Sequence, residues 1–174
     1  MKPPPFSYYD PASVEDAVKL LGTLDNAKIL AGGQSLMPML NMRYVLPDHV
    51  IDLNKIEGLS YIRDAGDALE IGAMTRQRDL EFSDLVQKRC PIMHEALLQV
   101  GHRQTRNRGT IGGSVAHADP AAELPAVLVA LDATMVITGV DGVRSVAAED
   151  FFLMYFTTSI QEQEILTEVR IPVL

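Results

Sequence analysis

The sequence predicts an α+β fold built from two lobes, and two observations support this fold class. The first is a strand–turn–helix–strand pattern over about the first fifty residues, which is typical of a small parallel sheet. The second is a succession of short strands, hairpin signals and helical segments in the rest of the chain, which indicates an antiparallel sheet with helices. We place the boundary between the lobes near residues 54–58, with a first lobe over 1–56 and a second over 57–174.

The first lobe is expected to contain a helix over 13–21. Ser13 is suited to be its N-cap, with Asp16 three positions further on, and Gly22 is suited to end it. The remaining elements of this lobe are a strand, a short helical piece and a second strand, expected over 28–31, 37–44 and 49–53.

The second lobe begins with a hairpin signal, because two apolar stretches flank the turn-forming residues Asp64-Ala65-Gly66-Asp67. A helix over 91–100 is favoured by Pro91, which suits a first helical turn. Its apolar side is expected to consist of Ile92, Met93, Ala96, Leu97 and Val100. The other expected elements are strands over 60–63, 68–72, 134–138, 143–147 and 164–171, and helices over 78–87 and from 123–125 to 131.

Composition limits the classes of function. Hydrophobic residues make up 47% and charged residues 22% of the 174 residues, which is ordinary for a globular protein. There is no apolar run long enough to span a membrane, and the N-terminus lacks the apolar segment of a signal peptide. The net charge of −8 argues against nucleic-acid binding.

Cysteine and histidine usage indicates a cytoplasmic protein without a metal centre. The single cysteine, Cys90, cannot form an intramolecular disulfide, which fits a reducing compartment. One cysteine also cannot hold an iron–sulfur cluster, and the four histidines lack the spacing of a zinc site. Any redox centre is therefore expected to be an organic cofactor.

Two glycine segments are the strongest functional signal. The first follows a predicted strand and reads Ala31-Gly32-Gly33-Gln34-Ser35-Leu36. Glycine reaches positive φ and lets a ligand approach the backbone, and successive free N–H groups bind anions without a basic side chain. We expect this segment to bind phosphate, with Ser35 as a further donor; an ordinary tight turn is an equally weighted alternative. Its spacing matches neither the dinucleotide-binding fingerprint nor the Walker motif.

The second glycine segment reads Gly109-Thr110-Ile111-Gly112-Gly113-Ser114. If it is a curved loop, the hydroxyls of Thr110 and Ser114 can border one pocket. Together with the first segment, it predicts a ligand with more than one phosphate, held by backbone N–H groups. For the arginines that precede it, we favour a solvated face or a partner-binding edge over phosphate contact; they are Arg103, Arg106 and Arg108.

Polar residues follow the second glycine segment. Asp119 and Glu123 can accept hydrogen bonds from ribose or ribityl hydroxyls. In the alternative reading they start a helix, with Asp119 as N-cap and Glu123 near the positive end of the helix dipole, and the two roles are compatible. We expect His117 to pack in a loop rather than act as a base, because no nucleophile stands at a matching spacing. No catalytic residue is assigned.

The glycine segments and their surroundings resemble the FAD-binding medium subunit of molybdenum hydroxylases, the family of aerobic carbon monoxide dehydrogenase with xanthine dehydrogenase as a fused relative. The resemblance is carried by residues 31–36, 106–114 and 116–125, the last beginning Ala-His-Ala-Asp-Pro. Shorter matches are Val50-Ile51-Asp52-Leu53-Asn54, Ile71-Gly72-Ala73-Met74-Thr75 and residues 165–172. They occur in order along nearly the whole chain.

The resemblance implies a vanillyl-alcohol-oxidase-type (PCMH-type) fold with FAD between its lobes. The segment that would hold the pyrophosphate consists of Ile29, Leu30, Ala31, Gly32, Gly33, Gln34, Ser35 and Leu36. The segment that would wrap the cofactor from the second lobe consists of Thr110, Ile111, Gly112, Gly113 and Ser114. The remaining implied cofactor contacts are Thr75, Ala118, Asp119, Glu123 and, beside the flavin ring, Ile160.

The resemblance also implies electron transfer. Such a flavin receives electrons from a 2Fe–2S small subunit and passes them to an external acceptor, while hydroxylation occurs at a molybdopterin-binding large subunit. Two alternatives stay open: a truncated assembly or interaction domain, and a stand-alone flavin oxidoreductase. Family members continue past Ile171-Pro172 into a C-terminal domain, so we expect this chain to lack that domain and to be a fragment, a truncated form or part of a split gene.

Overall fold

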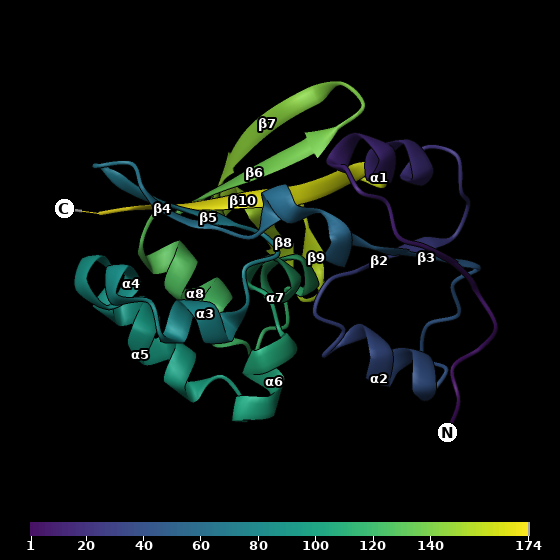
Figure 1. Cartoon of the computed structure of the whole chain (residues 1–174), viewed down its shortest axis with the longest axis horizontal. Helices are drawn as coiled ribbons and strands as arrows, with labels where there is room; N and C mark the ends of the chain where they lie inside the picture. Colours follow the sequence, from purple (N-terminus) through teal and green to yellow (C-terminus); the bar gives the residue numbers. More distant parts are fainter. Residues whose placement is uncertain (174) are drawn as a thin grey trace.

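The first lobe is a three-stranded parallel sheet with one helix on each side (Figure 1). The computed structural model describes residues 1–173. The strands lie in the order β1-β3-β2, and Ile29 pairs with Ile51 across the β2–β3 ladder. The elements of this lobe are β1 (Ser7–Tyr9), α1 (Val14–Leu21), β2 (Ala27–Leu30), α2 (Leu36–Asn41) and β3 (His49–Asp52). The carboxyl end of β2 therefore leads directly into the first glycine segment.

Helix α1 forms as its sequence predicts. The Oγ atom of Ser13 accepts a hydrogen bond from the N–H of Asp16 at 3.1 Å, and Gly22 is the C-cap residue. Ala17 and Val18 are the buried residues of this helix. The two expected strands of the lobe are also present, as β2 and β3.

Helix α2 is shorter than the helical piece expected over 37–44. It ends at Asn41, and Arg43 then takes a positive φ of 56°, which no α-helix continues through. Leu40 is the buried residue of this helix. The other methionines and apolar side chains of the piece are at least partly exposed, so α2 packs inward only on the side that carries Leu40.

The second lobe contains a five-stranded antiparallel sheet in the order β4-β5-β10-β6-β7. Two 3-10 turns, η1 (Leu53–Lys55) and η2 (Glu57–Leu59), connect it to the first lobe. Its strands are β4 (Ile62–Asp64), β5 (Ala68–Gly72), β6 (Thr134–Gly139), β7 (Gly142–Ala147) and β10 (Glu164–Pro172). The expected strands correspond to these five, and the sheet types confirm the α+β class.

Helices cover one face of this sheet (Figure 1), and the main core lies between the sheet and these helices. The sheet contributes Leu69, Ile71 and Val169 to this core, and the helices contribute Met93 and Leu97; all five are fully buried. The helices are α3 (Gln77–Glu81), α4 (Asp84–Arg89), α5 (Pro91–Gln99), α6 (Arg103–Arg108), α7 (Ile111–His117) and α8 (Glu123–Ala130). Within residues 1–173, no helix has the length and apolarity needed to cross a membrane.

Two details of the predicted helices are wrong. The helix expected over 78–87 is two helices, because the chain turns after α3 and Ser83 starts α4 by accepting a hydrogen bond from the N–H of Val86 at 3.3 Å. Ile92, expected on the apolar side of α5, is 46% exposed. The side of α5 that faces the core is defined by Met93 and Leu97.

The second glycine segment is not a curved loop. It forms the start of α7, whose first residue is Ile111. Glycine is a poor helix former, so helix propensity does not favour this helix; the Thr110 N-cap and hydrogen bonds to Ala73 and Thr75 stabilise it instead. The sequence also gives no signal for the short elements β1, α6, α9 (Ala148–Phe151), β8 (Phe152–Met154) and β9 (Thr157–Thr158).

A second, smaller core joins the two lobes. It buries Ala17 and Ile51 from the first lobe together with Met74 and Ile165 from the second. Burial of this apolar surface stabilises the contact between the lobes. Polar contacts add to it at the point where the glycine segments meet.

Candidate functional site

The two glycine segments meet in space. A Cβ atom at position 32 would clash with the carbonyl oxygen of Arg108 and lie 2.8 Å from the Cα atom of Gly109. A Cβ atom at position 113 would lie 3.4 Å from the Cβ atom of Ala31. Real side chains do not tolerate the first of these approaches, so glycine at position 32 is what lets the backbones of the two lobes touch.

The first glycine segment presents a row of free backbone donors. Gly33 has a φ of +74°, which turns the chain sharply after β2. Among the hydrogen bonds of residues 1–173, none uses a backbone N–H of residues 32–36 as donor, whereas the carbonyl of Gly33 accepts from the N–H of Met37 at 3.1 Å. Successive unpaired N–H groups around a turn form a concave anion site. Residues 32–36 therefore offer unpaired backbone donors, which the prediction of a phosphate site requires.

The side chains of this segment leave the donor row open. The Nε2 atom of Gln34 donates to the carbonyl of Gly32 at 3.3 Å and so braces the turn itself. Ser35 is the N-cap residue of α2, yet its exposed side chain makes no capping hydrogen bond. Its hydroxyl is consequently available to a bound anion. Of the residues at the end of β2, Ile29 and Leu30 are half-buried.

The second glycine segment uses its N–H groups within the protein. Those of Ile111 and Gly112 donate to Thr75 and Ala73 carbonyls at 3.1 and 2.9 Å, and that of Gly113 donates to the Oγ1 atom of Thr110 at 3.0 Å. The expectation of a second free N–H row is therefore wrong. Gly112 lies directly against Ala73, since a Cβ atom there would be 2.6 Å from its Cβ atom. The Gly112 side of this segment therefore packs inside the second lobe, and the segment does not supply a set of free donors.

Thr75 braces the second glycine segment from behind. It is 2% exposed, and its hydroxyl accepts from the N–H of Tyr61 at 3.0 Å and donates to the Tyr61 carbonyl at 2.9 Å. The hydroxyl thus acts as donor and as acceptor to the backbone of Tyr61. The neighbouring Gln77 N–H donates to the Gly109 carbonyl at 2.8 Å, which extends this bracing along the segment.

The three arginines before the second glycine segment do not share one role. Arg106 is 6% exposed; its Nε atom donates to Glu81 at 2.8 Å and its Nη1 atom donates to the Val100 carbonyl at 2.8 Å. For this residue the expected solvated face or partner edge is wrong, because its charge is paired inside the second lobe. Arg103 and Arg108 are exposed. Glu81 lies too far away in the sequence for the pairing to be recognised from spacing.

Of the two expected acidic residues after α7, Asp119 lies on a tight turn and Glu123 begins α8. Ala118 ends α7 with a φ of 49°, and the Oδ1 atom of Asp119 accepts from the N–H of Ala121 at 2.9 Å. Asp119 is therefore not the N-cap of α8, as one reading expects; that position belongs to Ala122. Glu123 lies in the first turn of α8 and is half-buried, as is Asp119.

His117 and Ile160 pack against other side chains of the second lobe. The ring of His117 lies 5.2 Å from that of Phe156, centroid to centroid, and the N–H of Phe156 donates to the Ala118 carbonyl at 2.9 Å. This agrees with the expectation of a packed histidine. Ile160, between β9 and β10, is half-buried against the main core.

Sequence reasoning assigned no role to the polar pair that connects the glycine segments. The Nδ2 atom of Asn54 donates to the Ala31 carbonyl at 2.9 Å, and its Oδ1 atom accepts from the Nη2 atom of Arg76 at 2.5 Å. Nη1 of the same guanidinium donates to the carbonyl of Arg108. Burial and, next, the charge of Arg108 lower the pKa of Arg76. The sequence did carry a signal for this pair: Asn54 lies in the segment 50–54 and Arg76 follows the segment 71–75, and both segments match the family.

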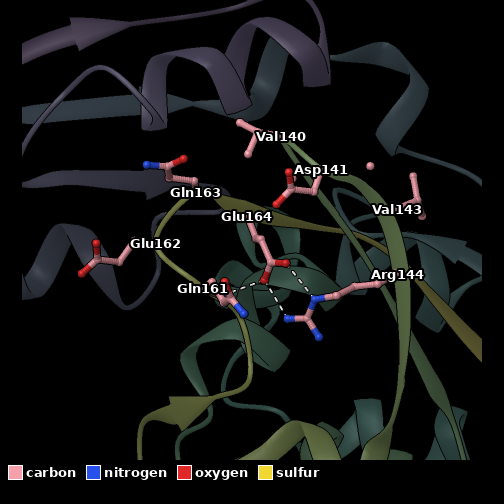
Figure 2. A pocket seen from close by; sticks show the side chains of 10 residues that line it. Val140, Asp141, Val143, Arg144, Gln161, Glu162, Gln163 and Glu164 are labelled. Atoms are coloured by element: carbon pink, nitrogen blue, oxygen red, sulfur yellow. Dashed lines mark hydrogen bonds and ion pairs between the residues drawn. The ribbon is translucent and has the colours of Figure 1, made fainter.

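Two surface hollows lie away from the glycine segments. Figure 2 shows the one between the β6–β7 hairpin and residues 161–164, where the Arg144 guanidinium donates two hydrogen bonds of 2.7 Å to the Glu164 carboxylate. This guanidinium holds the pKa of Glu164 below its usual range. The other hollow is lined by Tyr8 and residues of α1. Neither contains a residue of residues 31–36 or 109–114, so we base the candidate site on backbone geometry.

Comparison with known proteins shows the family to which this chain belongs. The chain belongs to the family described as "FAD binding domain in molybdopterin dehydrogenase", which matches residues 4–174. This confirms the resemblance to molybdenum hydroxylase FAD subunits, and the cofactor of the family is FAD.

Two relatives illustrate the match. The chain is 44% identical to the glyceraldehyde dehydrogenase medium chain of Sulfolobus acidocaldarius and 46% identical to the carbon monoxide dehydrogenase medium chain of Hydrogenophaga pseudoflava. The alignments cover 100% and 99% of this chain but 62% and 60% of those proteins. The chain thus spans about three-fifths of the length of these relatives.

Solved structures confirm the fold. Carbon monoxide dehydrogenase from Hydrogenophaga pseudoflava superposes with a TM-score of 0.98 at 46% identity, and quinoline 2-oxidoreductase from Pseudomonas putida 86 with a TM-score of 0.98 at 41%. Each match covers 100% of this chain and 61% of the compared chain. The expected FAD-binding fold with a parallel and an antiparallel sheet is therefore correct.

The residues present fit FAD at its phosphates. The unpaired N–H row of residues 32–36 complements a diphosphate, and the positive φ of Gly33 bends the chain within this row. This arrangement needs no lysine or arginine at the phosphates, which agrees with a chain of net charge −8.

Proposed function

We propose that this chain binds FAD between its two glycine segments and serves as the flavin-carrying part of an electron-transfer subunit of a molybdenum hydroxylase. Bound FAD would supply a redox centre that takes up and releases electrons. The observation that carries the proposal is the unpaired N–H row of residues 32–36, placed against the second lobe at Gly113. Family membership supports the same cofactor.

Each predicted contact has a role in this proposal. Residues 29–36 hold the diphosphate through backbone N–H groups, with Ser35 as a side-chain donor. Residues 110–114 cover the cofactor from the second lobe. The side chains of Asp119 and Glu123 accept hydrogen bonds from sugar or ribityl hydroxyls. Both are half-buried carboxylates that follow α7 in the chain. Ile160 offers an apolar contact for the ring, while Thr75 and Ala118 support the frame.

The partners in this proposal are a molybdopterin-binding large subunit and a 2Fe–2S small subunit. Electrons would enter from the iron–sulfur clusters and leave to an external acceptor, and substrate hydroxylation would take place on the large subunit. Several similar proteins are named as medium chains or as one subunit of a complex, including a nicotine 6-hydroxylase medium subunit of Paenarthrobacter nicotinovorans. We place such a complex in the cytoplasm, in keeping with the single cysteine.

The proposal is tested by titrating the purified chain with FAD and following flavin fluorescence. We expect saturable binding of one FAD per chain. Co-purification with the large and small subunits then tests the partners. Assembly with both subunits and no flavin uptake would overturn the electron-transfer proposal in favour of an assembly domain. Turnover of an oxidisable substrate by the isolated chain would instead favour a stand-alone oxidoreductase.

A further inference from the structure

A closed ring of contacts surrounds the point where the glycine segments touch. The Ala31 carbonyl accepts from Asn54, Asn54 accepts from Arg76, and the guanidinium of Arg76 donates to the Arg108 carbonyl. That carbonyl is the atom against which Gly32 packs. Because Ala31 and Gly32 are adjacent in the chain, the ring closes on itself. Two side chains thus connect the backbone of one glycine segment with that of the other.

Both side chains of the ring are held in position by their own neighbours. Asp52 accepts hydrogen bonds from the backbone N–H and the Nδ2 atom of Asn54 at 2.8 and 2.5 Å, and it also accepts from the hydroxyl of Tyr8 at 2.7 Å. The backbone of Arg76 forms an antiparallel bridge with Thr110. Each partner is therefore oriented before the other binds, which reduces the entropy lost on pairing.

Arginine suits this position better than lysine. The guanidinium has several donors in a rigid planar fork, so Nη1 and Nη2 can bond two acceptors on different lobes at once. An ammonium group on a flexible stem is a single point charge with no fixed fork. The apolar cluster that joins the lobes holds them together but lacks such directionality.

We propose that Arg76 and Asn54 are positioning residues that set the spacing of the two glycine segments and thereby the affinity for the diphosphate-bearing cofactor. This inference rests on the proposed function, in that the ligand is the FAD placed there. Neither residue needs to touch the cofactor. Their effect passes through the Ala31 and Arg108 carbonyls to the N–H row that begins at Gly32.

The test is a double-mutant cycle on FAD affinity with Arg76→Met, Asn54→Leu and the double variant. Each single change is expected to weaken FAD binding about tenfold, and the double variant to be about as weak as either one, because both remove the same link. Arg76→Lys is expected to restore little of the loss. The matched control is Arg78→Met, since Arg78 lies two residues away and its guanidinium carbon stacks 4.4 Å from the centre of the Phe82 ring.

Two results would overturn the inference: single variants that bind FAD as the unaltered chain does, or losses in affinity that simply multiply in the double variant. Melting temperatures are measured alongside, and an affinity loss that only follows a general loss of stability also counts against it. A readout without flavin separates this inference from the proposed function. In native-state hydrogen exchange, Arg76→Met should speed exchange of the N–H groups of Gln77 and Ile111 about tenfold relative to the strand amides of β10.

If the unaltered chain fails to bind FAD, the proposed function fails, while the exchange experiment still decides whether the Asn54–Arg76 pair fixes the glycine segments. Faster exchange at Gln77 and Ile111 alone would support the pair as the alignment device. Unchanged exchange would overturn it even in a chain that binds FAD well.

Discussion

Gly32 illustrates how much a single residue decides in this site. Its missing side chain lets the first lobe touch the backbone at Arg108 and Gly109 of the second. The sequence indicates that this glycine is needed in a turn, but it cannot indicate that the clash partner is backbone from the other lobe. The same limit explains why Arg106 is misread: its charge is paired with Glu81, a partner that only the fold brings within reach.

At this scale we predict that Gly33→Val and Gly113→Val each abolish or strongly weaken FAD binding. Valine at 33 must adopt a φ of +74° and would place Cβ 3.2 Å from Leu30 and Met37 side-chain atoms, which distorts the donor row. Equilibrium binding of FAD measures the effect. Gly66→Val is the control, because Gly66 has a φ of +93° and open space around its Cβ position on the β4–β5 turn.

The control carries the same kind of backbone strain at a place far from the site. Gly66→Val should therefore lower the melting temperature while leaving FAD affinity intact. If the Gly33 and Gly113 variants fold and bind FAD like the unaltered chain, the glycine segments do not hold the cofactor.

A pH dependence belongs to the Arg144–Glu164 pair. Because the folded protein holds the pKa of Glu164 below its ordinary value of 4.5, the pair stabilises the fold above that pH and loses its effect as the pH falls further. Glu164→Gln should lower the free energy of unfolding by about 1 kcal/mol at about pH 7, a modest value since Arg144 is partly exposed. The difference should shrink progressively as the pH falls below 4.5 and the Glu164 carboxylate becomes protonated. Urea unfolding over this pH range checks this, with Glu162→Gln, an exposed neighbour, as control.

At the scale of elements, α7 is the part of the fold that local sequence rules miss. Two glycines in its first turn argue against a helix, yet the N–H groups of Ile111 and Gly112 find carbonyl partners at Thr75 and Ala73. Tertiary hydrogen bonds thus replace the propensity that the sequence lacks. Strands and helices with their own caps and alternation, such as α1 with Ser13, are predicted well because their signals are local.

Helix α7 should depend on its cap. Thr110→Val removes the oxygen that accepts from Gly113 at 3.0 Å and should destabilise the protein by about 1 kcal/mol, since Thr110 is 1% exposed and the freed N–H stays poorly solvated. Thr110→Ser keeps the acceptor and should recover most of the loss. Chemical denaturation measures both variants. Equal stability of the valine and threonine proteins would show that the cap contributes nothing.

For the whole molecule, the arrangement of lobes converts two separate turns into one candidate site. The first lobe brings free donors at the end of β2, and the second brings the glycine-rich start of α7, which Thr75 and Arg76 brace. The sequence predicts both segments and, through family resemblance, their common ligand. It does not reveal that only one of them offers free N–H groups, because that depends on which carbonyls the fold places beside the other.

The central claim is that the N–H groups of residues 32–36 hold the phosphates of FAD, and amide NMR of the labelled chain during FAD titration tests it most directly. The account predicts large shifts and slower hydrogen exchange for these amides, with ADP reproducing the effect and the amides of Gly66 and Gly142 unchanged. Saturable FAD binding that leaves the amides of residues 32–36 unperturbed would contradict it.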